Sequence, residues 1–437
     1  MGLPLKLPKG IRARPWVRRQ LGTGRKSGCG ASWRQKFDGN SKGPGSRFAK
    51  VGERIHQVNF RSERSEDSVR RRVLSFGMSV WITFFGSALG SYLLGFPVAA
   101  LLLRCGVIDR PNARSSHARP TIRGGGIAIL AALGLAGIKL VLDQGGGVST
   151  VLLLGALVLA VVSFLDDLRS VPPLLRFGCH AAVAVAVLVA LLGPSASFGA
   201  GWGYPWGLSQ WLGLVVLFLW LTGYTNAFNF MDGINGIAAG QAVITGIGMA
   251  LLAGTETGRW DSAPVLFSLA LAGAAAGFLP HNFPRARMFM GDVGSAPLGF
   301  LLAALVCWLG LADHGRLLIP LALLHANFVL DTGITLVRRV WRGECWYAAH
   351  REHFYQRLVA SGKSHGFVTG WEMLLQLSVL ALVYVYLRVD GAAKVALGFG
   401  VVSLCGVFFL FSERAFRATE RARARSAAQG AGTSVCV

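Results

Sequence analysis

The chain contains a succession of apolar stretches that are each long enough to cross a membrane as a helix. A helix of about 20 apolar residues spans the ~30 Å hydrocarbon core, and roughly eleven such stretches follow one another. With 53% hydrophobic and only 15% charged residues, one water-soluble core could not bury the apolar surface. The sequence therefore predicts an all-α, polytopic transmembrane helical bundle. The expected spans lie near residues 78–103, 124–142, 148–165, 177–192, 208–225, 234–253, 263–279, 294–312, 317–337, 371–387 and 394–412.

Lys and Arg are distributed unevenly between the two sets of connections, and this predicts the orientation of the bundle. Cytoplasmic loops hold Lys and Arg in excess. The odd-numbered connections and the segment after the last span hold twenty of these residues, against five in the even-numbered connections. We therefore expect a multi-pass protein of the inner (cytoplasmic) membrane, with the odd-numbered connections and a basic tail at 413–437 in the cytoplasm.

Residues 1–77 conflict with this orientation. The first 75 residues hold nineteen Lys or Arg and five Asp or Glu, a net +14 of the chain's +23, yet an odd number of spans would place them outside. They are rich in Gly, Ser and Arg without a sustained apolar period, so we expect a disordered basic arm. Such an arm could bind anionic lipid or nucleic acid. We favour a true translation start near Met78, which would make this arm an upstream extension, and we expect no nucleic-acid binding.

Two motifs place polar residues at the predicted cytoplasmic ends of spans. Asp166 and Asp167 end the third span in SFLDDLRS, where an acidic pair is as readily a solvated helix end as a functional group. The connection between the fifth and sixth spans, NAFNFMDGINGIAAG, carries Asn226, Asn229 and Asp232. Asn and Asp also favour ordinary turns, so a polar hairpin would explain these residues equally well.

A third motif, PHNFPRARMFMGDVGS, follows the seventh span and carries Arg285, Arg287 and Asp292. Its glycines would let backbone amides approach a phosphate. The three motifs together supply the hard oxygen ligands that Mg2+ takes when it also holds substrate phosphates. Arg176 and the two other arginines add fork-shaped phosphate donors. The combination indicates a phosphoryl-transfer site that faces the cytosol.

At these motifs the sequence resembles the polyprenyl-phosphate N-acetylhexosamine-1-phosphate transferases, or glycosyltransferase family 4. This superfamily includes the peptidoglycan translocase and the O-antigen initiating transferases. The likeness covers about residues 80–412 in motif order, through GVIDRPNARSSHARPTIRGGGIAI, FLDDLRS, NAFNFMDGINGIA, NFPRARMFMGDVGS and HREHFYQRL. It implies magnesium-dependent transfer, with manganese as a substitute, from a UDP-N-acetylhexosamine to undecaprenyl (polyprenyl) phosphate with release of UMP. It also implies a role in initiating a lipid-linked polysaccharide such as lipopolysaccharide O-antigen, and leaves a homodimer open.

Carried over motif by motif, the resemblance implies roles for individual residues. Asp292 and Asp166 would hold the metal, and Asp167 would lie near the prenyl phosphate as base or metal partner. Asp232 and Asn226 would line the nucleotide and metal pocket, and the catalytic set would be Asp166, Asp167 and Asp232. Arg176 would meet the pyrophosphate, and His350 and His353 would belong to a sugar-recognition loop. The other substrate-binding candidates are Asn229, Arg285, Arg287, His117 and Arg123.

Departures from the family pattern limit this transfer. Several relatives carry an aspartate where this chain has Asn235, and the translocase has three consecutive histidines where this chain has only HREH. The second departure argues against a muramoyl-pentapeptide donor, although a His-x-x-His also occurs by chance in ordinary loops. Within the ninth span, His325 is expected to be an interhelical hydrogen-bond partner and Asp331 a structural or supporting residue.

A secondary transporter or lipid flippase of the inner membrane is the competing class. Transporters place their coupling residues near the midplane, often in two repeated halves. Here the carboxylates lie in cytoplasmic connections, and the sequence shows no repeat. An inactive scaffold is disfavoured because the acidic motifs are intact. The sequence leaves open which hexosamine is transferred. Single displacement is favoured over two steps, because a phosphate monoester is mostly dianionic and needs no strong base.

Overall fold

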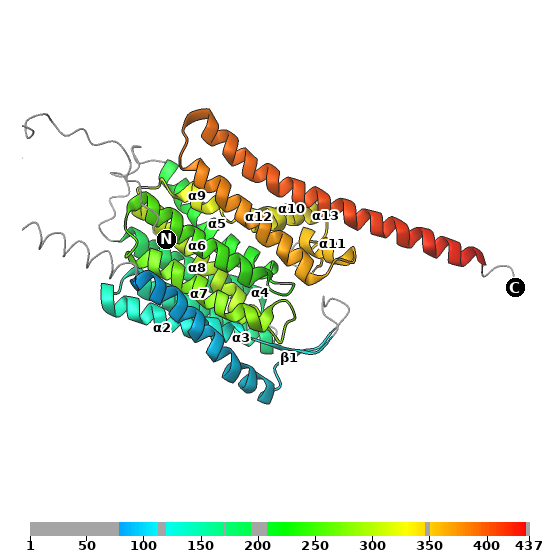
Figure 1. The fold of residues 1–437 in the computed structure, drawn as a ribbon, viewed down its shortest axis with the longest axis horizontal. Helices are drawn as coiled ribbons and strands as arrows, with labels where there is room; N and C mark the ends of the chain where they lie inside the picture. Colours follow the sequence, from blue (N-terminus) through cyan, green and yellow to red (C-terminus); the bar gives the residue numbers. More distant parts are fainter. Residues whose placement is uncertain (1–77, 112–118, 170, 194–207, 346–349, 434–437) are drawn as a thin grey trace, which may run out of the picture. The chain divides into compact units, whose positions relative to one another are not determined.

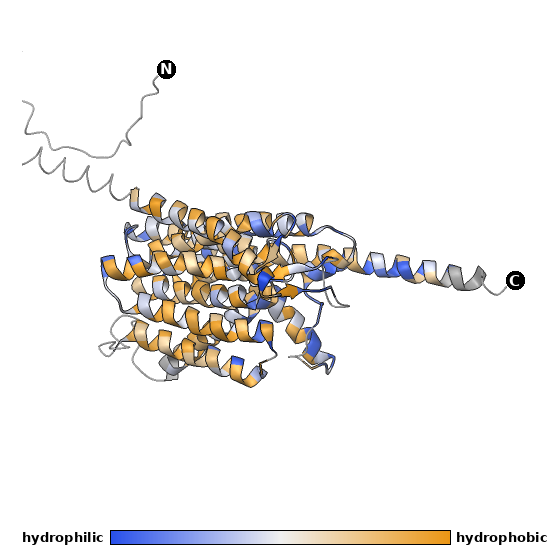
Figure 2. Cartoon of the chain, turned by 90° about the horizontal axis from the view of Figure 1, so that it is seen from below, coloured by the Kyte–Doolittle hydropathy of each residue, from blue (hydrophilic) through white to orange (hydrophobic). Residues whose placement is uncertain are grey.

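A computed structural model describes residues 78–111, 119–169, 171–193, 208–345 and 350–433. Most of these residues form helices that pack side by side (Figure 1). Ten helices in the described part are long and apolar enough to cross a membrane, and hydrophobic side chains run along them (Figure 2). The predicted polytopic helical bundle is confirmed. The expected basic arm at 1–77 lies outside the described residues.

Three consecutive helices form the core of the bundle. In their most apolar windows, α6 (Ile237–Thr257), α7 (Ala263–Asn282) and α8 (Asp292–Ala312) have 78%, 78% and 83% of their residues buried, against 22–39% in the other seven. The less buried helices present apolar side chains to lipid. Those of the first half are Met78–Arg104, α2 (Gly126–Gln144), α3 (Val148–Leu168), α4 (Pro173–Leu192) and α5 (Leu208–Phe230).

The ninth expected span, 317–337, is not a continuous helix. It consists of α9 (Leu318–Leu323) and α10 (Ala326–Trp341). At the break, the Leu324 carbonyl accepts a hydrogen bond of 2.6 Å from Gln376 Nε2. The backbone group that the break exposes is thus satisfied inside the protein, as a membrane interior requires. The described chain therefore has ten continuous helices of membrane length, and a broken segment where an eleventh was expected.

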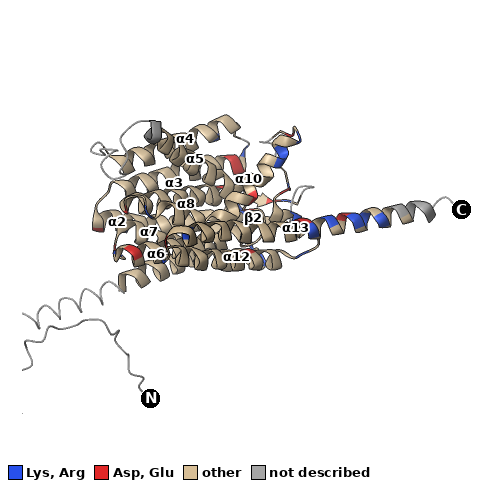
Figure 3. Cartoon of the chain, turned by 90° about the horizontal axis from the view of Figure 1, so that it is seen from above, with Lys and Arg blue, Asp and Glu red and all other residues tan. Residues whose placement is uncertain are grey.

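Three helices complete the chain: α11 (Phe354–Ala360), α12 (His365–Tyr386) and α13 (Gly391–Thr433). The secondary structure does not change at residue 413, where the basic tail was expected to begin, because α13 continues to Thr433. Its C-terminal half carries the arginines of that tail (Figure 3). The tail is therefore a helical extension of the last span.

A small sheet ties together two connections that are far apart in sequence. Strand β1 (Ile108–Asp109) pairs antiparallel with β2 (Thr121–Arg123), and β2 pairs parallel with β3 (Met288–Phe289). The pairing continues beyond the strands, since Gly125 N donates to the Phe289 carbonyl at 2.8 Å and Gly126 N donates to the Met290 carbonyl at 2.9 Å. The start of α2 is thereby fixed beside the start of α8.

The first turns of α2 and α8 touch through two glycines. A Cβ atom on Gly126 would lie 2.2 Å from the Cα of Gly294, which no side chain can accept. Small residues commonly allow this kind of close backbone approach between membrane helices. The contact brings the N-termini of the two helices to the same place.

Candidate active site

Two carboxylates from distant parts of the chain share one arginine. Asp167 lies near the end of α3, Asp292 begins α8, and Arg123 ends β2. Nη2 of Arg123 lies 2.7 Å from Asp167 Oδ1 and 3.1 Å from Asp292 Oδ1. The sheet explains this contact, because Arg123 pairs in register with Phe289, just before Asp292. We call Asp167, Asp292, Arg123 and the nearby Asp232 the carboxylate centre.

Asp167 is locked onto the first turn of α8. Its side chain is only 1% exposed, and Oδ2 accepts a hydrogen bond of 3.2 Å from Val293 N. Gly291, which precedes the helix, has φ +74°, and a Cβ there would lie 3.0 Å from Asp167 Oδ2. Glycine therefore suits this position for both its backbone conformation and its lack of a side chain. The helix N-terminus also favours the negative charge of the carboxylate.

Asp232 adds a third negative group from the connection between α5 and α6. Loss of water around its carboxyl raises the pKa of Asp232 well above the usual range, and the charges of Asp292 and Asp167 raise it further. Burial lowers the pKa of Arg123, but Asp292 and Asp167 outweigh that effect, so the pKa of Arg123 is raised overall. The centre thus holds more negative charge than its one arginine neutralises.

The donor set of this centre suits magnesium. Among the described residues, no three His, Cys, Asp or Glu side chains are grouped as a closed metal cage. Mg2+ usually takes only one or two carboxylates from a protein and completes its shell with water and substrate phosphates. Asp167 and Asp292 offer hard oxygen atoms to one common cation, the guanidinium of Arg123. This pair could therefore hold a divalent ion.

Asp166 faces a different partner. Its Oδ1 accepts a hydrogen bond of 2.8 Å from Val171 N, and its Oδ2 pairs with Arg176 of α4. Adjacent residues on a helix point about 100° apart, so Asp166 and Asp167 cannot both turn toward α8. The sequence paired Asp166 with Asp292, whereas the structure brings Asp167 to Asp292 and uses Asp166 to hold the α3–α4 connection.

The two predicted asparagines of α5 lie at different depths. Asn229 Oδ1 accepts a hydrogen bond of 3.2 Å from Ser295 Oγ in the first turn of α8, which places it beside the carboxylate centre. Asn226 lies about one turn deeper, where Nδ2 donates to the Thr222 carbonyl at 2.8 Å and lies 3.3 Å from His180 Nδ1. His180 was not predicted, because a single histidine in an apolar helix gives no motif.

The remaining predicted phosphate-binding residues occupy the surface near this centre. Arg285 and Arg287 are exposed in the connection between α7 and β3. His117 lies outside the described residues. A residue missed by the sequence reasoning, Asn282, fixes this connection: its Oδ1 accepts from Gly236 N at 2.6 Å and its Nδ2 donates to the Met288 carbonyl at 2.9 Å.

The histidine loop, residues 350–353, leads into α11 and is anchored by Asp331 of α10. The His353 Nδ1 lies 3.0 Å from Asp331 Oδ1, and the amides of Phe354 and Tyr355 donate to Asp331 Oδ2 at 3.0 and 3.4 Å. Both His353 and Asp331 are buried. The carboxylate therefore caps α11 and, by accepting a hydrogen bond from Nδ1–H, fixes the tautomer of His353. Asp331 thus has the supporting position expected of it.

The start of α11 packs directly on the motif that carries Asp232. Tyr355 Oη donates a hydrogen bond of 3.0 Å to the Phe230 carbonyl. A Cβ on Gly233 would lie 2.1 Å from that hydroxyl, so only glycine allows the contact. The His353 ring stacks on Phe230, with centroids 6.4 Å apart. The structure thereby brings the histidine loop next to the carboxylate centre.

Glu352 holds the loop through three arginines. Its carboxylate accepts from Arg339 Nη1 at 2.6 Å, from Arg342, and from Arg357 Nη2 at 3.3 Å. Burial alone would raise the pKa of Glu352, but the hydrogen bonds and charges of Arg342 and Arg339 lower it overall. The carboxylate therefore stays ionised and the loop stays clamped.

His350 is neutral at physiological pH. Burial, followed by the charges of His353 and Arg339, lowers the pKa of His350 to about 4. Its ring lies 4.9 Å from that of His353. His350 therefore offers a neutral hydrogen-bonding group, suited to a sugar or an amide, and not a cationic phosphate contact.

Comparisons with known proteins show which family the chain resembles. The family model described as glycosyl transferase family 4 matches residues 149–310. The chain is 31% identical over 317 residues to the decaprenyl-phosphate N-acetylglucosaminephosphotransferase of Mycobacterium tuberculosis, covering 64% of this chain and 75% of that protein. It is 28% identical to a probable undecaprenyl-phosphate N-acetylglucosaminyl 1-phosphate transferase of Bacillus subtilis, covering 65% and 78%.

The name of a third relative refers to a different transferred group. The phospho-N-acetylmuramoyl-pentapeptide-transferase of Heliobacterium modesticaldum is 32% identical over 271 residues, or 58% of this chain and 80% of that protein. The chain belongs to glycosyl transferase family 4, the family of the polyprenyl-phosphate N-acetylhexosamine-1-phosphate transferases.

Proposed function

We propose that the protein transfers an N-acetylhexosamine-1-phosphate from a UDP-sugar to a polyprenyl phosphate and releases UMP. The observation that carries this proposal is the bridge of Arg123 between Asp167 and Asp292, which gathers charged groups from three connections at one end of the bundle. The Lys and Arg distribution supports a cytoplasmic location for that end. This is where a water-soluble nucleotide sugar and a membrane-bound phosphate could meet.

Asp167 and Asp292 would hold magnesium, or manganese in its place, because carboxylate oxygens suit both ions. When bound, the ion would supply charge neutralisation for the pyrophosphate and the leaving UMP. Arg123 would then be free to donate to a phosphate oxygen. Asp232 would remain close to the nucleotide side of the centre, where burial raises the pKa of its carboxyl.

The reaction is a single displacement at phosphorus. An oxygen of the polyprenyl phosphate attacks the phosphorus that bears the sugar and forms a new P–O bond. The bond between that phosphorus and the bridging oxygen breaks, and the bridging oxygen leaves with UMP. A phosphate monoester has its second pKa near 6 and is mostly dianionic at neutral pH, so no general base is needed. The work of the protein is positioning and electrostatic stabilisation, as in other phosphoryl transfers.

The donor proposed here is UDP-N-acetylglucosamine. The names of the mycobacterial and Bacillus relatives refer to N-acetylglucosamine, and the loop has the two histidines of HREH in place of the three consecutive histidines of the translocase. The product would be the first lipid-linked sugar of a cell-envelope polysaccharide. The relatives favour cell-wall synthesis, and O-antigen synthesis is the alternative pathway.

Purified protein in detergent provides the test. With UDP-N-acetylglucosamine, Mg2+ and decaprenyl or undecaprenyl phosphate, UMP and the lipid-linked sugar should appear in equal amounts. Omitting either the lipid or Mg2+ should abolish both products. A transporter or flippase would release no UMP, and that result from folded, donor-binding protein would overturn the proposal. If only the muramoyl-pentapeptide donor, in a panel of donors, gave a lipid-linked product, the substrate would be reassigned.

A further inference from the structure

A cleft opens between the first helix and α2, at the end of the bundle opposite the carboxylate centre. It has a volume of about 1210 Å³, larger than the ~300–1,000 Å³ of ordinary small-molecule pockets. Both helices line it with residues spaced as one helix face. Those of the first helix are Ser79, Ile82, Thr83, Gly86, Ser87 and Gly90, and those of α2 are Ala132, Leu135, Ala136, Lys139, Leu140 and Asp143.

The cleft has the depth of one membrane leaflet. It is closed below where Gly90 meets Ala132, since a Cβ on Gly90 would lie 3.5 Å from the Ala132 Cβ. From Gly90 to Ser79 the helix rises about 17 Å, which is roughly half of the ~30 Å hydrocarbon core. A Cβ on Gly86 would meet nothing within 4 Å, so the space between the helices is open at that level.

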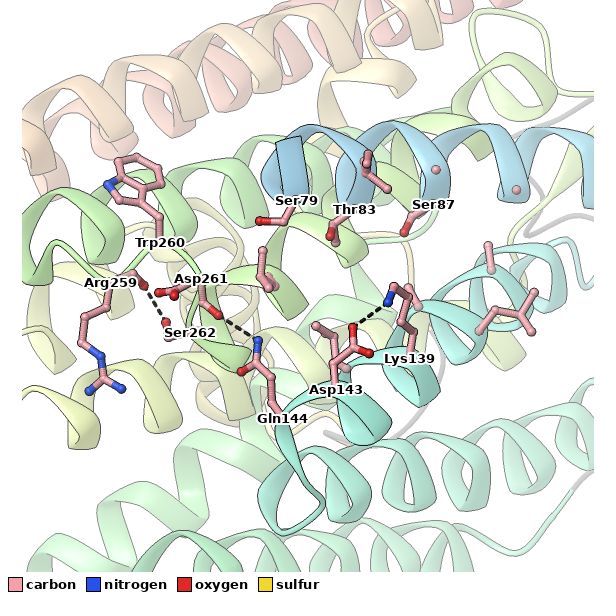
Figure 4. A pocket seen from close by; sticks show the side chains of 18 of the residues that line it. Ser79, Thr83, Ser87, Lys139, Asp143, Gln144, Arg259, Trp260, Asp261 and Ser262 are labelled. Carbon is pink, nitrogen blue, oxygen red and sulfur yellow. Dashed lines mark hydrogen bonds and ion pairs between the residues drawn. The ribbon is translucent and has the colours of Figure 1, made fainter. Parts of the chain in front are cut away.

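Apolar and polar residues both line this depth. Ile82, Leu135 and Leu140 form apolar walls, and Lys139 and Asp143 lie toward the C-terminal end of α2, near the rim. Figure 4 shows Ser79, Thr83 and Ser87 in a row along the first helix, facing Lys139 and Asp143 of α2. Ser87 is 5% exposed, and its hydroxyl has no hydrogen-bond partner among the described residues. A buried hydroxyl without a partner is unfavourable unless a ligand or water satisfies it.

The rim holds charges of both signs. Lys139 Nζ pairs with Asp143 Oδ2 at 2.6 Å, and Arg259 and Asp261, both exposed, come from the connection between α6 and α7. Trp260 lies between these two, at the level where aromatic residues meet lipid headgroups. Two cations and two anions at one rim fit a headgroup that itself carries a phosphate and an ammonium group.

We propose that this cleft binds one diacyl phospholipid with a zwitterionic ethanolamine headgroup. The phosphate lies against Lys139, the ammonium group lies against Asp143 and Asp261, and an acyl chain descends between the two helices past Gly86. An anionic lipid would satisfy the basic residues but would leave the two carboxylates unpaired. The site is separate from the carboxylate centre, and it stands whether or not the proposed transfer reaction is correct.

Native mass spectrometry of the full-length protein tests this site. The delipidated protein is titrated with phosphatidylethanolamine or phosphatidylglycerol that carry the same acyl chains. One phosphatidylethanolamine should bind about fivefold more tightly than phosphatidylglycerol, the factor expected for one additional charge contact at a membrane surface. Equal or tighter binding of phosphatidylglycerol would overturn the assignment of the headgroup.

Two kinds of variant locate the lipid. Gly86→Leu fills the open space and should lower phosphatidylethanolamine occupancy at least tenfold, whereas Gly134→Leu, on α2 but outside the lining, should leave it unchanged. Equal occupancy in the two variants would overturn the proposed location. If Gly86→Leu does not fold, the double change Asp143→Asn with Asp261→Asn decides the matter. It alters only exposed residues and should abolish the preference for phosphatidylethanolamine, and a retained preference would contradict the proposal.

Discussion

The carboxylate centre and the histidine loop lie side by side, but their carboxylates differ in how many hydrogen-bond donors surround them. In the histidine loop, Asp331 accepts from one histidine ring and two backbone amides, and Glu352 accepts from three arginines. In the carboxylate centre, Asp167 and Asp292 share the single nitrogen Nη2 of Arg123, and Asp167 also accepts a hydrogen bond from Val293 N. The first region has saturated carboxylates, and the second has carboxylates with unused acceptor capacity.

This difference separates residues that hold a shape from residues that are available for a ligand. A buried carboxylate with every oxygen paired stabilises one conformation of the chain. A carboxylate that shares its cation with another carboxylate can exchange that cation for a metal ion or a substrate-bound complex. We therefore expect substitutions in the carboxylate centre to affect the rate of transfer and substitutions around the histidine loop to affect donor binding and stability.

The largest effect should follow from removing charge in the carboxylate centre. Asp167→Asn or Asp292→Asn keeps the shape of the side chain but should lower kcat about 100- to 1,000-fold, as expected for lost electrostatic stabilisation at a phosphoryl transition state. The double variant should be little worse than either single one, because residues that act as a unit are not additive. The control is Asp313→Asn, which lies just after the far end of α8 and should keep normal turnover. Additive losses in the double variant would assign the two carboxylates to separate steps.

Asp331→Asn should produce a smaller and different effect. The amide cannot accept from His353 and the two α11 amides as strongly as the carboxylate does, and each charged hydrogen bond lost costs about 1.5–3 kcal/mol. We expect KM for the UDP-sugar to rise ~10- to 30-fold and the melting temperature to fall, with a smaller change in kcat. Steady-state kinetics and thermal unfolding in detergent measure both. A loss confined to kcat would instead place Asp331 at the reacting groups.

The two histidines should affect donor recognition without affecting the metal. His350→Ala and His353→Ala should each raise KM for the UDP-sugar about tenfold, or change the preference among N-acetylhexosamines, because one lost neutral hydrogen bond is worth ~1 kcal/mol and an unpaired partner group adds to that. The Mg2+ concentration for half-maximal rate should stay the same, since magnesium prefers oxygen ligands. A raised magnesium requirement with unchanged donor KM would show that the loop belongs to the metal site.

The sequence predicted the bundle well because long apolar stretches identify membrane helices directly. It did not predict the break at Leu324, because the residues that satisfy the freed carbonyl come from α6 and α12. It also missed the small sheet, because strands of two or three residues have no detectable period. The resemblance identified both aspartates of the DD pair, but it could not reveal which one faces α8. That choice depends on the rotation of α3 about its axis, which only the packed structure shows.

We expect the smallest effect at Asp166. This prediction compares the two neighbouring aspartates of the SFLDDLRS motif. Its partner Arg176 is 38% exposed, so the pair resembles a surface salt bridge worth ~0–1 kcal/mol. Asp166→Asn should therefore lower kcat less than tenfold, and Arg176→Gln should have a similar effect. A loss as large as that of Asp167→Asn would show that Asp166 takes part in the chemistry.

Binding of Mn2+, used as a spectroscopic substitute for Mg2+, tests the central claim most directly because it requires no turnover. Electron paramagnetic resonance would count the ions bound to purified protein in the presence of UDP-N-acetylglucosamine and in the absence of lipid. We predict that the wild type and Asp166→Asn bind one ion with similar affinity, and that Asp167→Asn and Asp292→Asn bind it at least tenfold more weakly. Normal binding by Asp167→Asn together with lost binding by Asp166→Asn would contradict the assignment of Asp167 and Asp292 as the shared metal site.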